Sequence, residues 1–255
     1  MIRLPKTVSY QNGVPVLKAK DIELLANRQL KEFDKHIFKD FRPINVDEFI
    51  ENYLKLDVEY QKLSLDGSVL GKTSLFDGAI PIISENGYRE IRVVKKGNIF
   101  VDLEACKCEN RIRFTMIHEA GHALLHQNVE RSVLENYKCC HETMTTIDKT
   151  GVITIMKART QLDWMEFQAD RYASCILMPR QCVRKIYEAK HKEYFDNMRI
   201  TSARPQRLWK ILYEMADEFQ VSKPAMALRL KTLNLISRDQ YDSLKINMEK
   251  KGELL

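Results

Sequence analysis

Apolar residues recur along the chain with two different periods, which separate helical from extended regions. Segments 20–33 and 45–56 show the helical period, in which apolar side chains return every three to four residues. In the second segment the apolar face consists of Val46, Phe49, Ile50, Tyr53 and Leu54. Both segments are predicted to be helices, and Asp21 is a candidate N-cap of the first.

Extended structure is expected from 57 to 103. The apolar runs there are short, rich in β-branched residues and interrupted by glycine, proline and asparagine. That texture is typical of strands joined by turns, and the segment KKGN at 95–98 is expected to form a hairpin turn.

The helical period returns at 111–126 and again at 161–178, where Pro179 ends the pattern. Residues 181–255 are expected to be helical throughout, whereas 127–160 show no clear period. Helices, then a small sheet, then further helices predict an α+β domain rather than a parallel sheet covered on both faces.

The composition says more about where the protein is located in the cell than about any reaction that it catalyses. The 255 residues contain 41 basic and 35 acidic side chains, which gives a net charge of +6 at pH 7. This mild excess permits contact with nucleic acid, and a solvated surface explains it equally well. No apolar run is long enough for a membrane span, and the N-terminus carries no signal-peptide pattern. We therefore expect a cytoplasmic protein without membrane contact.

The six cysteines are expected to be reduced thiols. A second, structural zinc site could in principle form from Cys106, Cys108, Cys139, Cys140 and His141. The spacing of these residues matches none of the common zinc-binding patterns. Buried or loop thiols are the preferred interpretation.

Three of the six histidines stand four residues apart in FTMIHEAGHALLH (114–126). His118 and His122 share one helix face and can bind a single ion, and Zn²⁺ suits two neutral imidazoles. Glu119 follows His118 and so lies about 100° around the helix from it. There it can act as the general base toward a water whose pKa zinc lowers toward about 7. His126 is expected to be a packing or supporting residue rather than a ligand.

A catalytic zinc needs a third protein ligand. Asn128 stands where one class of such sites has its third histidine, so a carboxylate from a later helix is expected instead. In WMEFQADRYASCILMP, Glu166 is the expected ligand. Asp170 shares its helix face and would accept the free ring N–H of one histidine. The small Ala169 and Ala173 would let this helix pack closely. The rival ligands are Glu130, Glu135, His141 and Glu142.

The two strings resemble the ImmA/IrrE-type metallopeptidases, which combine H-E-x-x-H with a later glutamate. The resemblance covers about 111–180. It implies a zincin-like fold, in which a small sheet packs on the H-E-x-x-H helix. It also implies that His118, His122 and Glu166 bind the metal and that Glu119 is the base. The matching residues are Arg113-Phe114, Glu166, Ala169-Asp170, Tyr172-Ala173 and Leu177-Met178-Pro179.

The same resemblance implies a cytosolic zinc endopeptidase, encoded on mobile elements or in stress regulons, that cleaves or inactivates a helix-turn-helix repressor. The long segment 127–160 departs from the family pattern and leaves the substrate open. Candidates for stabilising the oxyanion are suggested by residue type alone: Tyr137, His141 and Tyr172.

The stretch 208–237 predicts an amphipathic helix, a short turn with Ser222 as N-cap, and a second helix that stops at Asn234 in the left-handed conformation. This pattern resembles a helix-turn-helix, with Lys223, Arg229 and Lys231 expected to be exposed. A helical cap on the peptidase domain is the preferred interpretation, because the basic face is sparse.

The expected organisation is a metallopeptidase domain at 1–180 and a helical region at 181–255. Two functions compete for this organisation. The first is a zinc endopeptidase that cleaves a helix-turn-helix repressor. The second is a regulator that binds DNA, through 208–237, or binds protein and acts by sequestration with little or no proteolysis. Glu119 favours the enzyme, because a protein that only binds has no need of a base.

Overall fold

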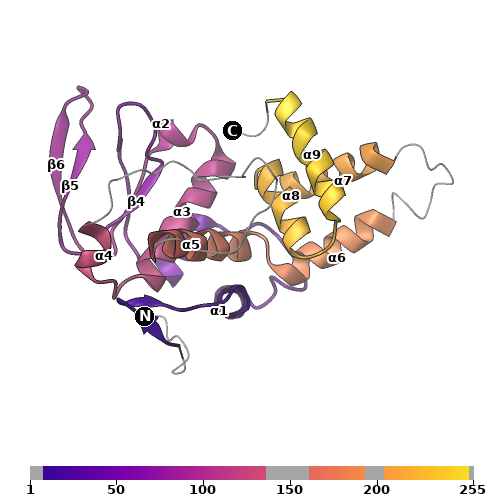
Figure 1. Ribbon diagram of the computed structural model, residues 1–255, viewed down its shortest axis with the longest axis horizontal. Helices are drawn as coiled ribbons and strands as arrows, with labels where there is room; N and C mark the ends of the chain where they lie inside the picture. The colour runs from indigo at the N-terminus through magenta and orange to yellow at the C-terminus, as the bar shows by residue number, and fades with distance from the viewer. Residues whose placement is uncertain (1–7, 136–160, 193–203, 253–255) are drawn as a thin grey trace. The chain divides into compact units, whose positions relative to one another are not determined.

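The computed structural model of the chain describes residues 8–135, 161–192 and 204–252. By its internal contacts the chain divides into two compact units. Unit 1 consists of Met1–Ala26 and Asn45–Ala173, and unit 2 of Asn27–Ile44 and Ser174–Leu255. Helices occur in both units, whereas every described strand belongs to unit 1 (Figure 1). The α+β class is therefore confirmed, and the domain boundary expected at 180 stays a prediction.

Unit 1 is built on a three-stranded sheet of β3 (Val58–Tyr60), β4 (Gly71–Thr73) and β7 (Ile99–Val101). The middle strand, β7, runs parallel to β3 and antiparallel to β4. Its three apolar residues are fully buried, as expected of a short apolar run in a sheet core. Helix α3 (Glu109–Leu125) packs against β4 and β7. The small sheet packed on the histidine helix is therefore confirmed, and the arrangement is consistent with a zincin-like domain.

A separate hairpin is formed by β5 (Gly78–Ile83) and β6 (Arg89–Val94). Its loop contains Asn86-Gly87, and Gly87 has a φ of +80°, a conformation that three-residue hairpin loops commonly require of their last residue. The expectation of a hairpin turn at 95–98 is wrong. A turn occurs there, but it leads from β6 to β7, and these strands belong to different sheets because β6 pairs with β5.

The N-terminal residues form a further hairpin, in which β1 (Tyr10–Gln11) pairs with β2 (Val14–Pro15). Asn12 and Gly13 make the turn with φ values of 47° and 78°, as in a two-residue turn with both central residues left-handed. Gly13 has no room for a side chain, because a Cβ there would lie 1.7 Å from the main-chain oxygen of Asn128.

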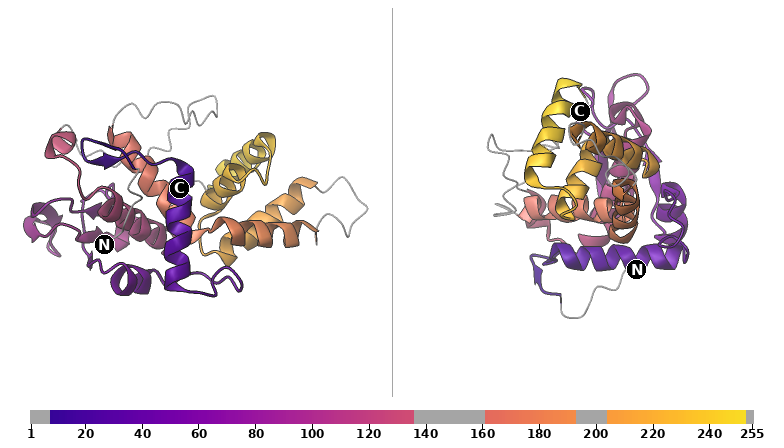
Figure 2. Two further views of the ribbon diagram at one scale, coloured as in Figure 1. Left: turned by 90° about the horizontal axis from the view of Figure 1, so that it is seen from below. Right: turned by 90° about the vertical axis from the view of Figure 1, so that its right-hand side faces the viewer.

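Of the two expected N-terminal helices, the first is present as predicted and the second is present in altered form. Helix α1 (Ala19–Phe33) matches the prediction and is one unbroken helix (Figure 2). Asp21 is not its N-cap, because it lies inside the first turn and accepts a hydrogen bond from the Lys18 N–H at 2.9 Å. The helix expected at 45–56 is largely replaced by a π-helix, η1 (Glu48–Tyr53). Apolar periodicity marks the buried face there without fixing how tightly the backbone is wound.

Three further helices complete unit 1 or begin in it. They are α2 (Leu103–Cys106), α4 (Arg131–Glu135) and α5 (Gln161–Leu177). Helix α5 ends one residue before the end predicted from Pro179. None of the described helices is long and apolar enough to cross a membrane.

Unit 2 is helical where it is described. Its main helices are α6 (Arg180–His191), α7 (Arg204–Glu218), α8 (Lys223–Thr232) and α9 (Arg238–Lys250), and each packs on the next. The predicted apolar face of α7 is buried, the Ser222 hydroxyl caps α8, and Asn234 has a φ of +55°. These three local predictions are confirmed.

Arg229 contradicts the expected basic face of α8. Its side chain is only 1% exposed. The guanidinium Nε donates to the Met178 main-chain oxygen at 2.9 Å, and Nη1 lies 3.7 Å from Cys175 Sγ. The expectation of an exposed Arg229 is wrong because this arginine bonds a helix-end carbonyl inside unit 2.

The two lysines of the same stretch are partly buried rather than exposed. The Lys223 ammonium lies 3.7 Å from the ring centroid of Tyr213, and the Lys231 ammonium lies 4.0 Å from that of Tyr241. Such cation–π contacts hold both lysines against their own helical unit.

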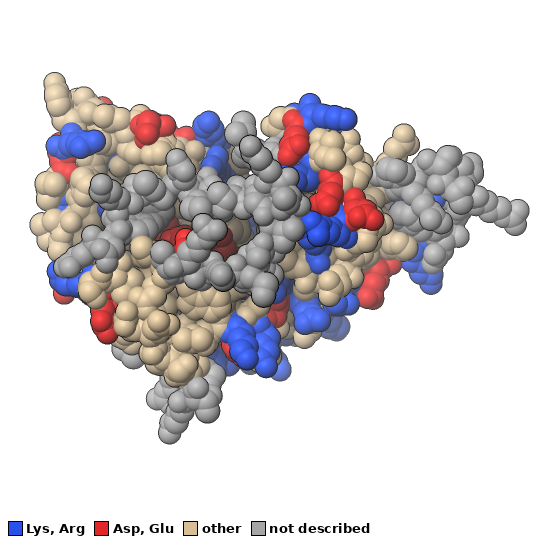
Figure 3. Space-filling model, viewed as in Figure 1, with Lys and Arg blue, Asp and Glu red and all other residues tan. Residues whose placement is uncertain are grey.

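Basic and acidic side chains are interleaved on the helices of unit 2. Lys190 lies 3.1 Å from Glu214 and 3.4 Å from Glu218, and Lys245 lies 3.7 Å from Glu249. Figure 3 shows blue and red groups side by side over these helices on the face in view. A continuous basic surface is therefore not formed by the described residues of that face.

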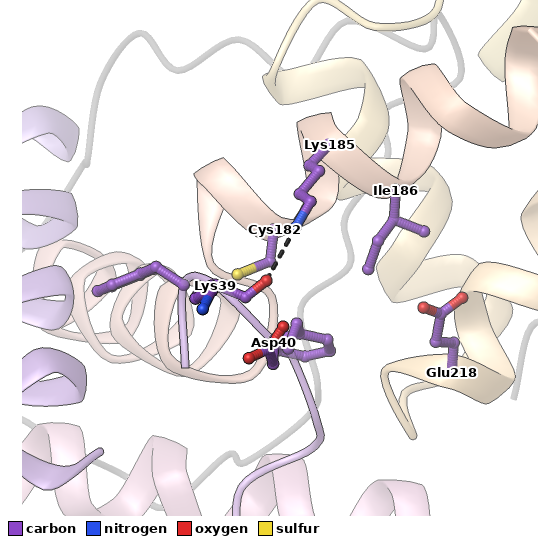
Figure 4. A pocket seen from close by; sticks show the side chains of 8 residues that line it. Lys39, Asp40, Cys182, Lys185, Ile186 and Glu218 are labelled. Carbon is purple, nitrogen blue, oxygen red and sulfur yellow. Dashed lines mark hydrogen bonds between the residues drawn. The ribbon is translucent and has the colours of Figure 1, made fainter. Parts of the chain in front are cut away.

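Unit 2 also contains a pocket of about 250 Å³, lined in part by Lys39, Cys182, Lys185 and Glu218 (Figure 4). The Lys185 ammonium donates to the Lys39 main-chain oxygen at 2.8 Å. Burial raises the pKa of the Cys182 thiol to about 11. That thiol is therefore protonated, and a weak nucleophile, at neutral pH.

Candidate metal centre

Helices α3 and α5 bring together two histidines and a glutamate in unit 1. His118 Nε2 lies 3.2 Å from Glu166 Oε2, and His122 Nε2 lies 3.4 Å from Glu166 Oε1. The two Nε2 atoms are 3.1 Å apart. One ligand atom from each residue falls within 4.8 Å of the others, and no other such group of three occurs among the described residues.

Close packing of the two helices makes this meeting geometrically feasible. A Cβ built on Gly121 would lie 3.2 Å from Ala169 Cα and 3.2 Å from the Tyr172 ring. Glycine on α3 and alanine on α5 therefore let the backbones approach closely (Figure 1). Tyr172 is fully buried at this contact, which makes it a packing residue and gives no support to its candidate role at the oxyanion.

The donor set fits a zinc ion. Two imidazole nitrogens and one carboxylate are the ligand types that Zn²⁺ takes in catalytic sites, with a further position left for water or substrate. Both histidines direct Nε2 to the shared point while Nδ1 bonds another residue. The three side chains are thus oriented toward one position, which is the arrangement a metal requires.

Charge at the centre is complementary. Burial alone would lower the pKa of the His118 imidazole, but the hydrogen bonds that its ring donates to the Asp170 and Glu166 carboxylates outweigh it and hold that pKa well above its usual value. Burial alone would raise the pKa of Glu166, but contacts with His118 and His122 hold it well below the usual range. The carboxylates that favour a proton on His118 equally favour a metal cation.

Asp170 lies where the sequence places it, on the same face of α5 as Glu166. Its Oδ1 is 2.9 Å from His118 Nδ1. A carboxylate cannot donate when ionised, so the ring nitrogen donates and Nδ1 carries the proton. When the ring is neutral, as a metal ligand must be, its lone pair lies on Nε2, toward Glu166 and His122.

Glu119 is 4% exposed and is held by the edge strand β4. The Thr73 hydroxyl lies 2.6 Å from Glu119 Oε2 and 2.8 Å from its main-chain oxygen. Gly71, on the same strand, leaves room for the carboxylate, since a Cβ there would be 2.9 Å from Oε1. Sequence reasoning missed both β4 residues, because 46 positions separate Thr73 from Glu119.

His126 is fully buried behind His122 rather than beside the three donors. Its Nδ1 is 3.0 Å from His122 Nδ1, and its Nε2 is 3.2 Å from Gln168 Oε1. The interpretation of His126 as a supporting residue agrees with this placement. The sequence pattern does not predict the role of Gln168, because a two-residue offset from Glu166 puts it on a different face of the helix.

Several sequence candidates fall elsewhere. Cys106 is buried, with Sγ 3.7 Å from Thr115 Oγ1, and Cys108 is exposed. Glu130 is not part of the donor group. The remaining rivals and candidates lie outside the described residues or have side chains outside them: Glu135, Tyr137, Cys139, Cys140, His141 and Glu142.

Comparison with known proteins agrees with this centre. The sequence model of a peptidase family, described as the IrrE N-terminal-like domain, matches residues 92–231. This range covers more than half of the chain and includes His118, His122 and Glu166. A search of curated proteins finds no match. The resemblance seen in the two sequence strings is thereby confirmed, and the chain belongs to the peptidase family of the IrrE N-terminal-like domain.

Proposed function

We propose that the protein is a zinc-dependent endopeptidase. The observation that carries this proposal is the convergence of His118, His122 and Glu166 on one point. The buried Glu119 carboxylate lies on α3, the helix that carries the two histidines. Membership of a peptidase family supports the reaction type. A protein that only binds would have no use for a base beside the three converging ligands.

The three converging residues would hold the metal. When bound, zinc supplies Lewis-acid activation of a water molecule and of the scissile carbonyl. Asp170 keeps the His118 proton on Nδ1, so that Nε2 remains a ligand. This division of tasks leaves Glu119 free of any ligand role.

Proton transfer is assigned to Glu119. Its carboxylate takes a proton from the attacking water and delivers one to the leaving amine, as a positioned general base and acid does. Thr73 and the absence of a side chain at Gly71 fix where that carboxylate lies. The edge strand therefore contributes to catalysis by positioning the base.

The substrate we propose is a helix-turn-helix repressor, whose cleavage relieves repression in the cytoplasm during a stress or mobile-element response. This choice rests on the resemblance to ImmA/IrrE-type peptidases. The competing function, a DNA-binding regulator, draws no support from α8, because Arg229 is buried and the two lysines contact tyrosines. Sequestration of a protein without cleavage is an outcome of the test below.

Glu119→Gln separates catalysis from binding. The variant keeps its shape and its zinc but loses the base, so cleavage should fall by roughly 10²–10⁴-fold. Glu109→Gln, at an exposed residue in the first turn of the same helix, is the matched control and should cleave like wild type. Each form is incubated with the helix-turn-helix repressor encoded nearest the gene, and intact-mass spectrometry follows the products.

Wild type and Glu109→Gln should yield two repressor fragments, and Glu119→Gln should yield a stable complex. If wild type relieves repression without producing fragments, the protein acts by sequestration and the peptidase proposal is wrong. Fragments produced equally by Glu119→Gln would remove this residue from the role of base.

A further inference from the structure

A line of buried polar groups continues behind His122, away from the converging donors. His122 Nδ1 lies 3.0 Å from His126 Nδ1, and His126 Nε2 lies 3.2 Å from Gln168 Oε1. The Gln168 amide nitrogen donates to the Pro15 main-chain oxygen at 2.6 Å. His126 and Gln168 are both 0% exposed, so water cannot replace these partners.

The Pro15 end of this line gives it a direction. A main-chain oxygen can only accept, so the amide nitrogen of Gln168 must face Pro15 and its oxygen must face His126. That oxygen also only accepts, so His126 Nε2 carries a proton. A neutral imidazole has a single N–H, which leaves His126 Nδ1 as an acceptor.

His122 must therefore donate from Nδ1, and its lone pair lies on Nε2. That is the nitrogen 3.4 Å from Glu166 Oε1. If His126 is neutral, this is the only arrangement of protons in which the His122–His126, His126–Gln168 and Gln168–Pro15 contacts are all hydrogen bonds. A cationic His126 would donate from both nitrogens and force the His122 proton onto Nε2, and burying that charge is unfavourable.

We propose that the main-chain oxygen of Pro15, acting through Gln168 and His126, fixes the tautomer of His122 and so makes its Nε2 available to the metal. The proposal rests on the proposed function, since it takes His122 as a ligand. Pro15 would then be a positioning residue of the centre, although it lies outside the part of the chain, 92–231, that matches the family.

The two histidines are held by different devices. His118 is oriented by Asp170, a carboxylate that is itself largely exposed. His122 is oriented by a neutral line of buried groups that ends on the backbone of β2. The N-terminal hairpin that carries β2 is fixed to α5 a second time, because Gln161 bonds the Gln11 main-chain oxygen and the Asn12 side chain at 3.1 Å each.

The first test needs no variant. The full chain, loaded with zinc and labelled with ¹⁵N in its histidines, is studied by NMR to find which ring nitrogen carries each proton. The account expects the His122 proton on Nδ1 and the His126 proton on Nε2. A His126 proton on Nδ1 would overturn the proposal, because the line of bonds would then run the other way.

The second test compares two glutamines of α5. Gln168→Met removes the amide from the line with little change in length, whereas Gln161→Met removes the two hydrogen bonds between Gln161 and the N-terminal hairpin. Zinc affinity is measured by competition with a chromophoric chelator. Gln168→Met should bind zinc roughly 10–100-fold more weakly and show both His126 tautomers. Gln161→Met should keep wild-type affinity and a single tautomer.

The outcomes separate this inference from the proposed function. If His122→Ala loses zinc but Gln168→Met binds it as wild type does, the ligand set stands and the Pro15 line has no positioning role. Equal losses in Gln161→Met and Gln168→Met would show that the hairpin acts only as a structural tether. If His122→Ala keeps full zinc affinity, the ligand assignment beneath both proposals is wrong.

Discussion

At the scale of single residues, the centre depends on which nitrogen of each ring is protonated. His118 and His122 present Nε2 to a shared point because another group bonds each Nδ1. Asp170 does this for His118 with a charged carboxylate, and the bond is partly accessible to water. Removing such a partner leaves the ligand in place but frees its ring to rotate and its proton to move.

Asp170→Ala should therefore weaken zinc binding by roughly 10–100-fold without abolishing it. Asp163→Ala, which removes a carboxylate from the first turn of the same helix, is the matched control and should leave affinity unchanged. Chelator competition gives both constants. Wild-type affinity in Asp170→Ala would mean that its hydrogen bond to His118 does not orient the ligand.

At the scale of elements, the edge strand β4 lies against Glu119, the proposed base. A Cβ on Gly71 would lie 2.6 Å from Thr115 Cγ2, 2.8 Å from Glu119 Cγ and 2.9 Å from its Oε1. Gly71→Ala should therefore displace the Glu119 carboxylate and lower cleavage by about 10²-fold, the low end of what a general base contributes, with zinc content unchanged. Gly78→Ala is the control, because a Cβ there meets nothing within 4 Å. Wild-type cleavage by Gly71→Ala would show that the base tolerates displacement.

Helix α8 is held by a buried arginine, and that gives a stability prediction. Arg229→Met fills a similar volume but leaves the Met178 carbonyl without this donor. Unfolding free energy should fall by about 1–3 kcal/mol. In a Trp164→Phe background, Trp209 on α7 reports urea unfolding of this unit. Lys231→Met, on the same helix, should cost less than about 1 kcal/mol, since it loses only a cation–π contact. An unchanged midpoint in Arg229→Met would contradict the structural role.

The elements differ in how far sequence predicts them. Helices α3, α5 and α7 follow from long apolar periods, and Ser222 and Asn234 follow from cap chemistry within a few residues. The pairing of strands into hairpins at 10–15 and 78–94 was not predicted, although each segment contains an Asn-Gly pair that signals a turn. The π-helix η1 could not be distinguished from an α-helix, because its two buried residues, Phe49 and Ile50, are adjacent and fit either winding.

At the scale of the whole molecule, the candidate metal centre draws on distant parts of the chain. The spacing within one helix predicts His118 and His122, and a second helix face predicts Glu166 and Asp170. Gln168 bonds Pro15 across 153 positions, and neither residue has a local pattern that announces the contact. Residues that bind a metal leave a signature in sequence, whereas residues that orient them follow from the tertiary fold.

The zinc content of the purified 255-residue chain tests the central claim most directly. Elemental analysis after dialysis should find one zinc per chain in wild type and in Glu119→Gln, because the base is not a ligand. Glu166→Ala should lose its zinc, since two histidines alone do not hold the ion firmly. A Glu166→Ala chain that retains one zinc, or a wild-type chain that takes up none, would contradict the account.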